Sequence, residues 1–333
     1  MDDSQSSAAH VVLLGDSTID NVCWTGHPLE VAAQLQEKLQ EAKITNYAAD
    51  GFTSTDLLQG AVPVISWSKR REVGDPFPDS GLDRNFAPLD ALEGLEKPSH
   101  AVLSIGGNDV REILGNLGKL PEIIARFQAN YTEILGRLLK SVPNCILMLQ
   151  YRPSFYMDGG GYGVYQAIGS LPGPGSAVQK LNQLMETIYA PVLSEARKHK
   201  LVIADLPRTF DIFDDELYCC QIEPSAKGGA LIATLLGHVV KHHDFSGPSK
   251  LLFIRDGEIV EEVNDGRPWS IPYDPNDEKS KESRLAGQGI DTEKYKQLCA
   301  MGFEPTRSLQ SLQACNNDLE DAISQLTTPA EQS

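Results

Sequence analysis

A serine that could act as a nucleophile follows the first apolar run of the chain. Val11–Leu14 are consecutive apolar residues, and they lead directly into Gly15, Asp16 and Ser17. A run of this kind predicts a buried strand, and ligands bind at the carboxyl ends of the strands in a parallel sheet. Ser17 would then present its hydroxyl at that edge, beside the backbone N–H groups of the next helix. Serine is also a frequent helix N-cap, so this motif alone leaves a structural role equally open.

Two further polar blocks favour the nucleophile over the cap. The apolar run Ala101–Ile105 ends in the cluster GGND at residues 106–109, and residues 46–51 read NYAADG. Together with Gly-Asp-Ser, these blocks resemble the SGNH (GDSL-type) hydrolase family, and the resemblance extends over residues 11–240. It implies an α/β domain that hydrolyses acyl esters.

The resemblance also implies a role for each matching residue. Ser17 would be the nucleophile. The backbone N–H groups of Ser17 and Gly51 and the side-chain amide of Asn108 would form an oxyanion hole, in which each donor contributes on the order of 3 kcal/mol. Asp16 and Asp109 are expected to hold the turns through side-chain to backbone hydrogen bonds.

The last block departs from the family pattern. Where the family has Asp-x-x-His-Pro, this chain has Cys220 at the aspartate position and Glu223, followed by Pro224, at the histidine position. A carboxylate is a weaker base than imidazole, so Glu223 would need a raised pKa to accept the serine proton. Burial beside Ile222 and Pro224 and the acidic run 214–216 are expected to raise it. The alternative is that Glu223 anchors a loop and the site binds a ligand without turning it over.

The elements around these blocks alternate between strand and helix, which is typical of a doubly wound α/β domain. The predicted fold is therefore a three-layer, flavodoxin-like parallel sheet. Two polar stretches, 67–88 and 152–175, are expected to be loops over the sheet edge. Residues 251–263 alternate around Asp256-Gly257 and predict a hairpin that either extends the sheet or forms a separate flap. The clearest strands are Val11–Leu14, Ala101–Ile105, Cys145–Leu149 and Leu201–Ala204, and the clearest helices are Pro28–Ala42, Pro121–Lys140, Ser176–Lys198 and Ala226–Val240.

Three short helical patterns lie at the C-terminal end, and Met301-Gly302-Phe303 joins the first two. This arrangement resembles a ubiquitin-associated (UBA) domain, an all-α three-helix bundle. The resemblance implies that Met301, Gly302 and Phe303, together with Leu326, present an apolar patch to ubiquitin. A core role for Met301 and Phe303 is the alternative.

Composition divides the chain into five segments and limits its partners. The formal net charge of -17 argues against binding to nucleic acid, and no run reaches the roughly 20 apolar residues that span a membrane. Residues 1–10 lack a secretory signal and the cysteines lack a zinc spacing, so we expect a cytoplasmic protein without metal or organic cofactor. The segments are a disordered N-terminus (1–10), an SGNH hydrolase-like domain (11–245), a β-hairpin extension (246–272), a flexible linker (273–290) and a UBA-like domain (291–327).

The sequence leaves two candidate functions. The first is an intracellular serine esterase that hydrolyses a small acyl ester through Ser17 and binds ubiquitin or ubiquitylated proteins through its C-terminal module. The second is a catalytically inactive adaptor with the same fold, which binds a ligand or protein and recruits ubiquitin. A covalent adduct on Ser17 is expected only for the first.

Overall fold

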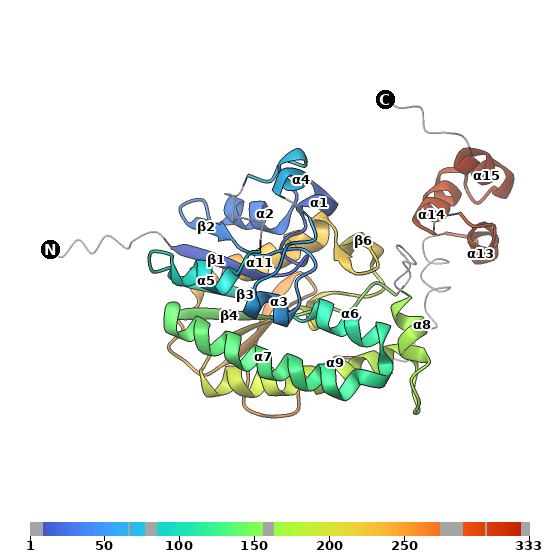
Figure 1. Ribbon diagram of the computed structural model, residues 1–333. Coiled ribbons are helices and arrows are strands. Elements are labelled where there is room, and N and C mark those ends of the chain that lie inside the picture. Colours follow the sequence, from blue (N-terminus) through green and yellow to red (C-terminus); the bar gives the residue numbers. More distant parts are fainter. Residues whose placement is uncertain are drawn as a thin grey trace.

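The computed structural model describes residues 9–65, 67–76, 85–155, 163–273, 289–303 and 305–327. Most of the predicted disordered N-terminus and of the predicted linker lies outside these residues. The described chain forms an α/β unit and a small helical module, each with its own apolar core (Figure 1).

A seven-stranded sheet with the order β2-β1-β3-β4-β5-β8-β9 forms the centre of the α/β unit. The strands from β2 to β8 are parallel, and only β9 is antiparallel to its neighbour. The predicted parallel sheet is therefore confirmed. Its strands are β1 (His10–Gly15), β2 (Lys43–Asn46), β3 (His100–Ser104), β4 (Asn144–Leu149), β5 (Val202–Asp205), β8 (Lys250–Arg255) and β9 (Glu258–Val263).

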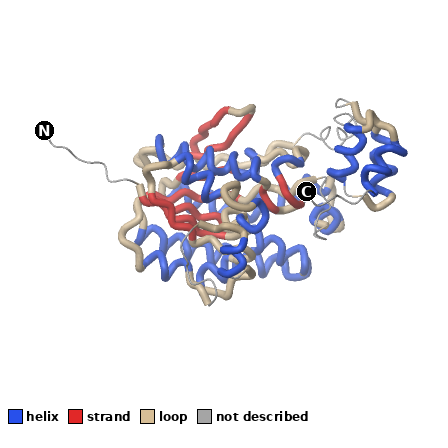
Figure 2. Tube along the Cα trace, turned by 90° about the horizontal axis from the view of Figure 1, so that it is seen from above, coloured by secondary structure: helices blue, strands red, loops and turns tan. Residues whose placement is uncertain are grey.

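Helices cover both faces of this sheet, as Figures 1 and 2 show. Successive side chains of a strand point to opposite faces, so Val11 and Leu13 pack on one side and Val12 and Leu14 on the other. The first side packs against α2 (Val31–Lys38), α10 (Leu206–Thr209) and α11 (Ala226–His242). The second packs against α3 (Ser54–Gln59), α5 (Pro88–Glu93), α6 (Gly107–Gly115), α7 (Leu120–Ser141), α8 (Val164–Gly169) and α9 (Ala177–Lys198).

The hairpin at residues 250–263 extends the sheet, which decides between the two alternatives left open by the sequence. Ile203 of β5 pairs with Leu251 of β8, and the predicted Asp256-Gly257 turn has positive φ values of 52° and 80°. The sheet thus continues past residue 245, where the sequence pattern ended the domain, because β8 needs β5 as its hydrogen-bonding partner. The Trp269 indole then donates a 2.7 Å hydrogen bond to the Asp205 carboxylate.

The two stretches expected to be loops contain helices, so that expectation was wrong in part. Helix α4 (Trp67–Glu72) lies in the first stretch and α8 lies in the second. Helix α4 has almost no apolar periodicity, but its Arg70 is 1% exposed and forms ion pairs with Asp20 and Asp75. Tertiary contacts of this kind, which local sequence does not reveal, stabilise a helix of six residues. Residues 66, 77–84 and 156–162 lie outside the described chain.

The C-terminal module consists of three helices around one small core, as predicted. Helices α13 (Thr292–Ala300), α14 (Pro305–Ala314) and α15 (Leu319–Thr327) bury Tyr295, Leu298, Leu312, Ala322 and Leu326. Asp291 caps the first of them by accepting hydrogen bonds from the N–H groups of Glu293 and Lys294.

Candidate active site

Ser17 lies where β1 leaves the sheet, at its carboxyl edge. The preceding Gly15 has φ +152°, and a Cβ at this position would overlap the Ser104 carbonyl oxygen of β3. Glycine is therefore required for the close approach of the two strand ends. The N–H of Asp16 donates a 3.1 Å hydrogen bond to the same carbonyl oxygen, which fixes the start of the turn.

The Asp16 side chain stabilises this turn. Its carboxylate accepts hydrogen bonds from the Thr18 N–H at 3.1 Å and from the Gln150 amide at 3.2 Å. Gln150 in turn accepts from the Thr18 hydroxyl at 2.7 Å. Asp16 is 2% exposed, and burial raises its pKa to about 7, against the opposing effect of these hydrogen bonds. Its contacts are those of a group that positions Ser17, as the sequence suggested.

Glu223 lies beside Ser17 although 206 positions separate them. The Ser17 hydroxyl donates a 3.1 Å hydrogen bond to Glu223 Oε1. A two-stranded ribbon of β6 (Tyr218–Cys220) and β7 (Glu223–Pro224) carries the glutamate, and the short η3 turn (Asp215–Leu217) precedes it. The Ser225 hydroxyl then caps α11 by accepting from the Gly228 N–H at 3.1 Å. The backbone thus fixes Glu223 on both sides.

The environment of Glu223 favours its neutral form. Glu223 is 3% exposed. Burial raises the pKa of Glu223 to about 9, and the charges of Asp50, Cys220 and Asp16 add to the rise. The hydrogen bond from Ser17 opposes this shift. At neutral pH the Glu223 carboxyl is therefore protonated in most molecules.

The predicted rise in the pKa of Glu223 has a different electrostatic source from the one expected. Asp214 and Glu216 of the acidic run pair instead with Lys227, at 3.1 and 2.6 Å. Asp215 accepts a 2.6 Å hydrogen bond from the Ser154 hydroxyl. Besides Cys220, which lies on the same ribbon, the charges that raise the pKa of Glu223 are those of Asp50 and Asp16 at the ends of β2 and β1, which reach it only in the folded sheet.

Gly51 and Asn108, the other two residues expected at the site, follow β2 and β3, the strands on either side of β1. Gly51 has φ +84°, which favours glycine, and a Cβ there would overlap the Val64 side chain. Asn108, in the first turn of α6, donates a 3.0 Å hydrogen bond from its amide to the Phe52 carbonyl oxygen. The amide carries a second N–H that can donate to a ligand.

Sequence reasoning missed several residues that position this site. The Asp20 carboxylate accepts a 2.9 Å hydrogen bond from the Asp50 N–H, and buried Arg70 pairs with Asp20 at 3.4 Å. Gln150 follows β4 directly, so its position after an apolar run could have predicted that it lies at the carboxyl edge of the sheet. Arg70 gave no signal, because an arginine in a polar stretch is usually exposed.

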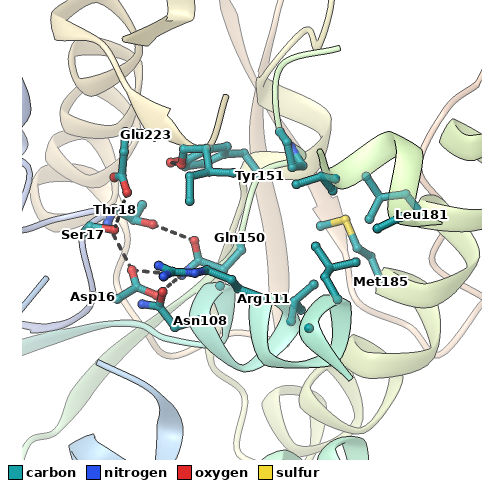
Figure 3. A pocket seen from close by; sticks show the side chains of 18 of the residues that line it. Asp16, Ser17, Thr18, Asn108, Arg111, Gln150, Tyr151, Leu181, Met185 and Glu223 are labelled. Atoms are coloured by element: carbon teal, nitrogen blue, oxygen red, sulfur yellow. Dashed lines mark hydrogen bonds between the residues drawn. The ribbon is translucent and has the colours of Figure 1, made fainter. Parts of the chain in front are cut away.

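A pocket of about 330 Å³ opens at Ser17 and extends away from it between α6, α8 and α9. Figure 3 shows the polar side chains at one end and Leu181 and Met185 at the other. All seven histidines are described, and none lines this pocket. The polar lining residues are Asp16, Ser17, Thr18, Asn108, Arg111, Gln150 and Glu223, and the apolar and aromatic ones are Val110, Leu114, Tyr151, Pro153, Val164, Ala167, Leu181, Met185, Tyr189 and Ile222.

The residues expected to bind ubiquitin differ in exposure. Met301 is 56% exposed, and Gly302 after it has φ +89°. Phe303 is half-buried against the module core. Leu326 is only 9% exposed and packs in that core, so most of its side chain is covered by the module itself.

Two kinds of site are absent from the described residues. They contain no group of three or more His, Cys, Asp or Glu side chains able to hold a metal ion. No helix within them is both long enough and apolar enough to cross a membrane.

The fold and the pocket define a doubly wound α/β protein with a serine and a carboxyl group at the carboxyl edge of its sheet, followed by a three-helix module. Residues 290–326 match the family described as UBA/TS-N domain. The C-terminal module is a UBA domain. No curated protein matches the chain.

Similar solved structures include esterases and lipases. An acetylxylan esterase from Geobacillus stearothermophilus is 16% identical, with 71% of this chain and 94% of the esterase covered and a TM-score of 0.43. An extracellular lipase from Streptomyces rimosus is 14% identical, with 68% and 98% covered and a TM-score of 0.41. A possible lipase from Chitinophaga pinensis is 17% identical, with 71% and 99% covered and a TM-score of 0.44.

Proposed function

We propose that the chain is an SGNH-type serine hydrolase that cleaves acyl esters and binds ubiquitin through its UBA domain. The observation that carries the proposal is the 3.1 Å hydrogen bond from the Ser17 hydroxyl to Glu223 at the polar end of the pocket. Nucleophilic catalysis requires a hydroxyl within hydrogen-bond reach of a base, and we assign that role to Glu223 in its ionised form.

The oxyanion formed by attack on an ester carbonyl needs donors at the same edge. The backbone N–H groups of Ser17 and Gly51 and the second N–H of the Asn108 amide are the donors that we assign to it. The hydrogen bond from this amide to the Phe52 carbonyl supports the assignment, because it fixes the orientation of the amide before substrate binds.

The pocket indicates which part of an ester it accepts. Its far end is apolar, which suits the acyl chain and leaves the alcohol at the open, polar end. The cavity of about 330 Å³ is far larger than the space that a single water molecule needs, so it can take more than an acetyl group. The preferred acyl chains are therefore longer than acetyl.

A fluorophosphonate probe tests the activity directly, since it phosphonylates only an activated serine. We expect the purified wild-type protein to be labelled and Ser17→Ala to remain unlabelled. Ser154→Ala is the matched control, because this hydroxyl is buried, donates to Asp215 and does not line the pocket. Absence of labelling in the wild type would leave the second candidate, a ligand-binding adaptor. The burial of Glu223, which raises its pKa and favours the protonated form, supports this candidate.

A further inference from the structure

Arg111 is the one cation among the described residues that line the pocket. Its side chain comes from α6 and is exposed, and Figure 3 shows it at the polar end of the pocket, away from Leu181 and Met185 at the apolar end. Asn108 lies one turn earlier on the same helix, so the Cβ atoms of the two residues are about 5–6 Å apart. The guanidinium of Arg111 therefore reaches the region next to a proposed oxyanion donor.

The acidic side chains of the pocket are less accessible to a ligand than Arg111. Among the described residues, Asp16 and Glu223 line the pocket, and both are buried. The Asp16 carboxylate accepts hydrogen bonds from the turn that it stabilises. Glu223 accepts from Ser17, and its burial favours the neutral form. A ligand at the open end thus meets the positive charge of Arg111, although the whole chain has a formal net charge of -17.

The N-terminus of α6 adds to the positive potential at this end of the pocket. Gly107 and Asn108, in the first turn of this nine-residue helix, line the pocket. A helix N-terminus carries a partial positive charge that attracts anions. Asp109 is acidic and lies in the same turn, but its carboxylate accepts two hydrogen bonds from Ser54. The helix thus brings two attractive features to one place, its N-terminus and the Arg111 side chain.

An arginine at this position suits a carboxylate or a phosphate. The planar guanidinium presents five N–H donors, and it binds either anion through two parallel hydrogen bonds. The far end of the pocket is apolar, and an unpaired charge is costly to bury there. An anionic group would therefore lie at the open end, on the alcohol part of an ester and not on its acyl chain.

We propose that Arg111 binds an anionic group, a carboxylate or a phosphate, on the alcohol part of the substrate ester. The inference rests on the hydrolase activity proposed above and names the class of ester that the site selects, an apolar acyl chain joined to a negatively charged alcohol. The guanidinium contacts this anion in the ground state and in the transition state alike. It therefore lowers KM and has little effect on kcat.

A second role for Arg111 concerns Asp50, which follows β2 and is buried. Burial raises the pKa of Asp50, and the charge of Arg111 opposes this rise. Loss of such a role would affect the hydrolysis of every ester alike, whereas loss of a contact with the substrate affects only an anionic ester. A comparison of matched esters separates the two roles.

Two esters with the same acyl chain test the inference. 3-Hexanoyloxy-4-nitrobenzoate carries a carboxylate on its leaving alcohol, and 2-nitrophenyl hexanoate is the neutral counterpart. We expect Arg111→Gln to raise KM for the anionic ester at least about tenfold with kcat within about twofold, and to change kcat/KM for the neutral ester by less than about threefold. Arg111→Lys should recover part of the loss, because it keeps the charge without the planar pair of donors. Arg126→Gln, at an exposed arginine that pairs with Glu112 and does not line the pocket, is the matched control.

Ionic strength gives a second readout. For the wild type, added salt should lower kcat/KM more for the anionic ester than for the neutral one, and this difference should disappear in Arg111→Gln. A third ester, with a phosphate in place of the carboxylate, distinguishes the two anions, and the expected loss with either of them supports the inference.

The outcomes separate this inference from the hydrolase proposal. Losses of equal size on the neutral and anionic esters would assign Arg111 to Asp50 and overturn the inference. Unchanged kinetics of Arg111→Gln on both anionic esters, or a wild type that hydrolyses only the neutral ester, would overturn it as well. A wild type that hydrolyses none of the esters faster than Ser17→Ala overturns the hydrolase proposal itself.

Discussion

Ser54 donates two hydrogen bonds to the carboxylate of Asp109, from its N–H at 2.8 Å and from its hydroxyl at 2.6 Å. Ser54 begins α3 shortly after Gly51, and Asp109 follows Asn108 in α6. This pair therefore fixes the spacing between the two strand ends that carry the proposed oxyanion donors. Ser54 is fully buried and Asp109 is 2% exposed, so water cannot replace either partner cheaply.

Replacing Asp109 by Asn should lower both stability and turnover. One of the two acceptor oxygens becomes an N–H₂ donor that faces a donor of Ser54, so we expect unfolding to become easier by about 1–3 kcal/mol. We also expect kcat to fall more than KM rises, because Asn108 shifts relative to Gly51. Urea unfolding and ester kinetics measure the two effects. Asp90→Asn, at a 71% exposed carboxylate paired with Arg137, should change stability by less than about 1 kcal/mol.

Substitution of Gly51 by Ala should harm activity more than substitution of another glycine. Its φ of +84° costs an alanine about 1–2 kcal/mol, and the new methyl group displaces the Val64 side chain. We expect kcat to drop by at least about tenfold with a stability loss of that size. Gly136→Ala is the control, because this glycine lies inside α7 with open space around it and should gain up to about 1 kcal/mol. Equal kinetics in the two variants would contradict the role of Gly51.

The acyl-chain preference should depend on the apolar end of the pocket. We expect the wild type to prefer p-nitrophenyl esters with acyl chains longer than two carbons, because the far end of the pocket is apolar. Ala167→Phe fills this end, so kcat/KM for the ten-carbon ester should fall at least about tenfold while that for the two-carbon ester stays unchanged. The neighbouring Gln166→Phe, at an exposed position outside the pocket, should keep the wild-type profile.

Glu223 should make the folded protein less stable as the pH rises. Its pKa is raised from 4.5 to about 9 on folding, so the stability it contributes is complete below about pH 4.5 and is lost as the pH rises toward 9. The loss approaches about 1.4 kcal/mol per pH unit within this window. Glu223→Gln removes this loss, so the variant should gain stability over the wild type between pH 5 and 9 in urea unfolding. A difference that is constant with pH would mean that Glu223 titrates near its ordinary value.

The sequence predicted those parts of the fold and site that follow local rules. Apolar runs ending in Gly-Asp-Ser and Gly-Gly-Asn-Asp placed Ser17 and Asn108 at strand ends, because parallel strands share one carboxyl edge. Glu223 was identified by its position before Pro224, and the structure brings it to Ser17. Each of these predictions needed only a short window of sequence and the geometry of a sheet.

The remaining features depend on contacts between distant segments. The position of the Asp50 backbone depends on the Asp20 carboxylate, which pairs with Arg70 of a helix without apolar periodicity. The state of Glu223 depends on charges that only the folded sheet brings near. Leu326 was assigned to the ubiquitin-binding patch through the resemblance to UBA domains, and its burial in the module core follows from packing between helices that local sequence does not show.

Binding of the UBA domain to ubiquitin should depend on Met301. This side chain is 56% exposed although large and apolar, whereas Phe303 and Leu326 pack into the core. Met301→Glu puts a charge into an apolar interface without touching that core, so we expect at least about a tenfold weaker Kd for monoubiquitin and an unchanged helical circular dichroism. Glu293→Gln, on an exposed face of α13, should bind like the wild type. Labelling of Ser17 should be the same in all three proteins, because the UBA core shares no residue with the α/β core. Wild-type affinity in Met301→Glu would show that ubiquitin binds elsewhere or not at all.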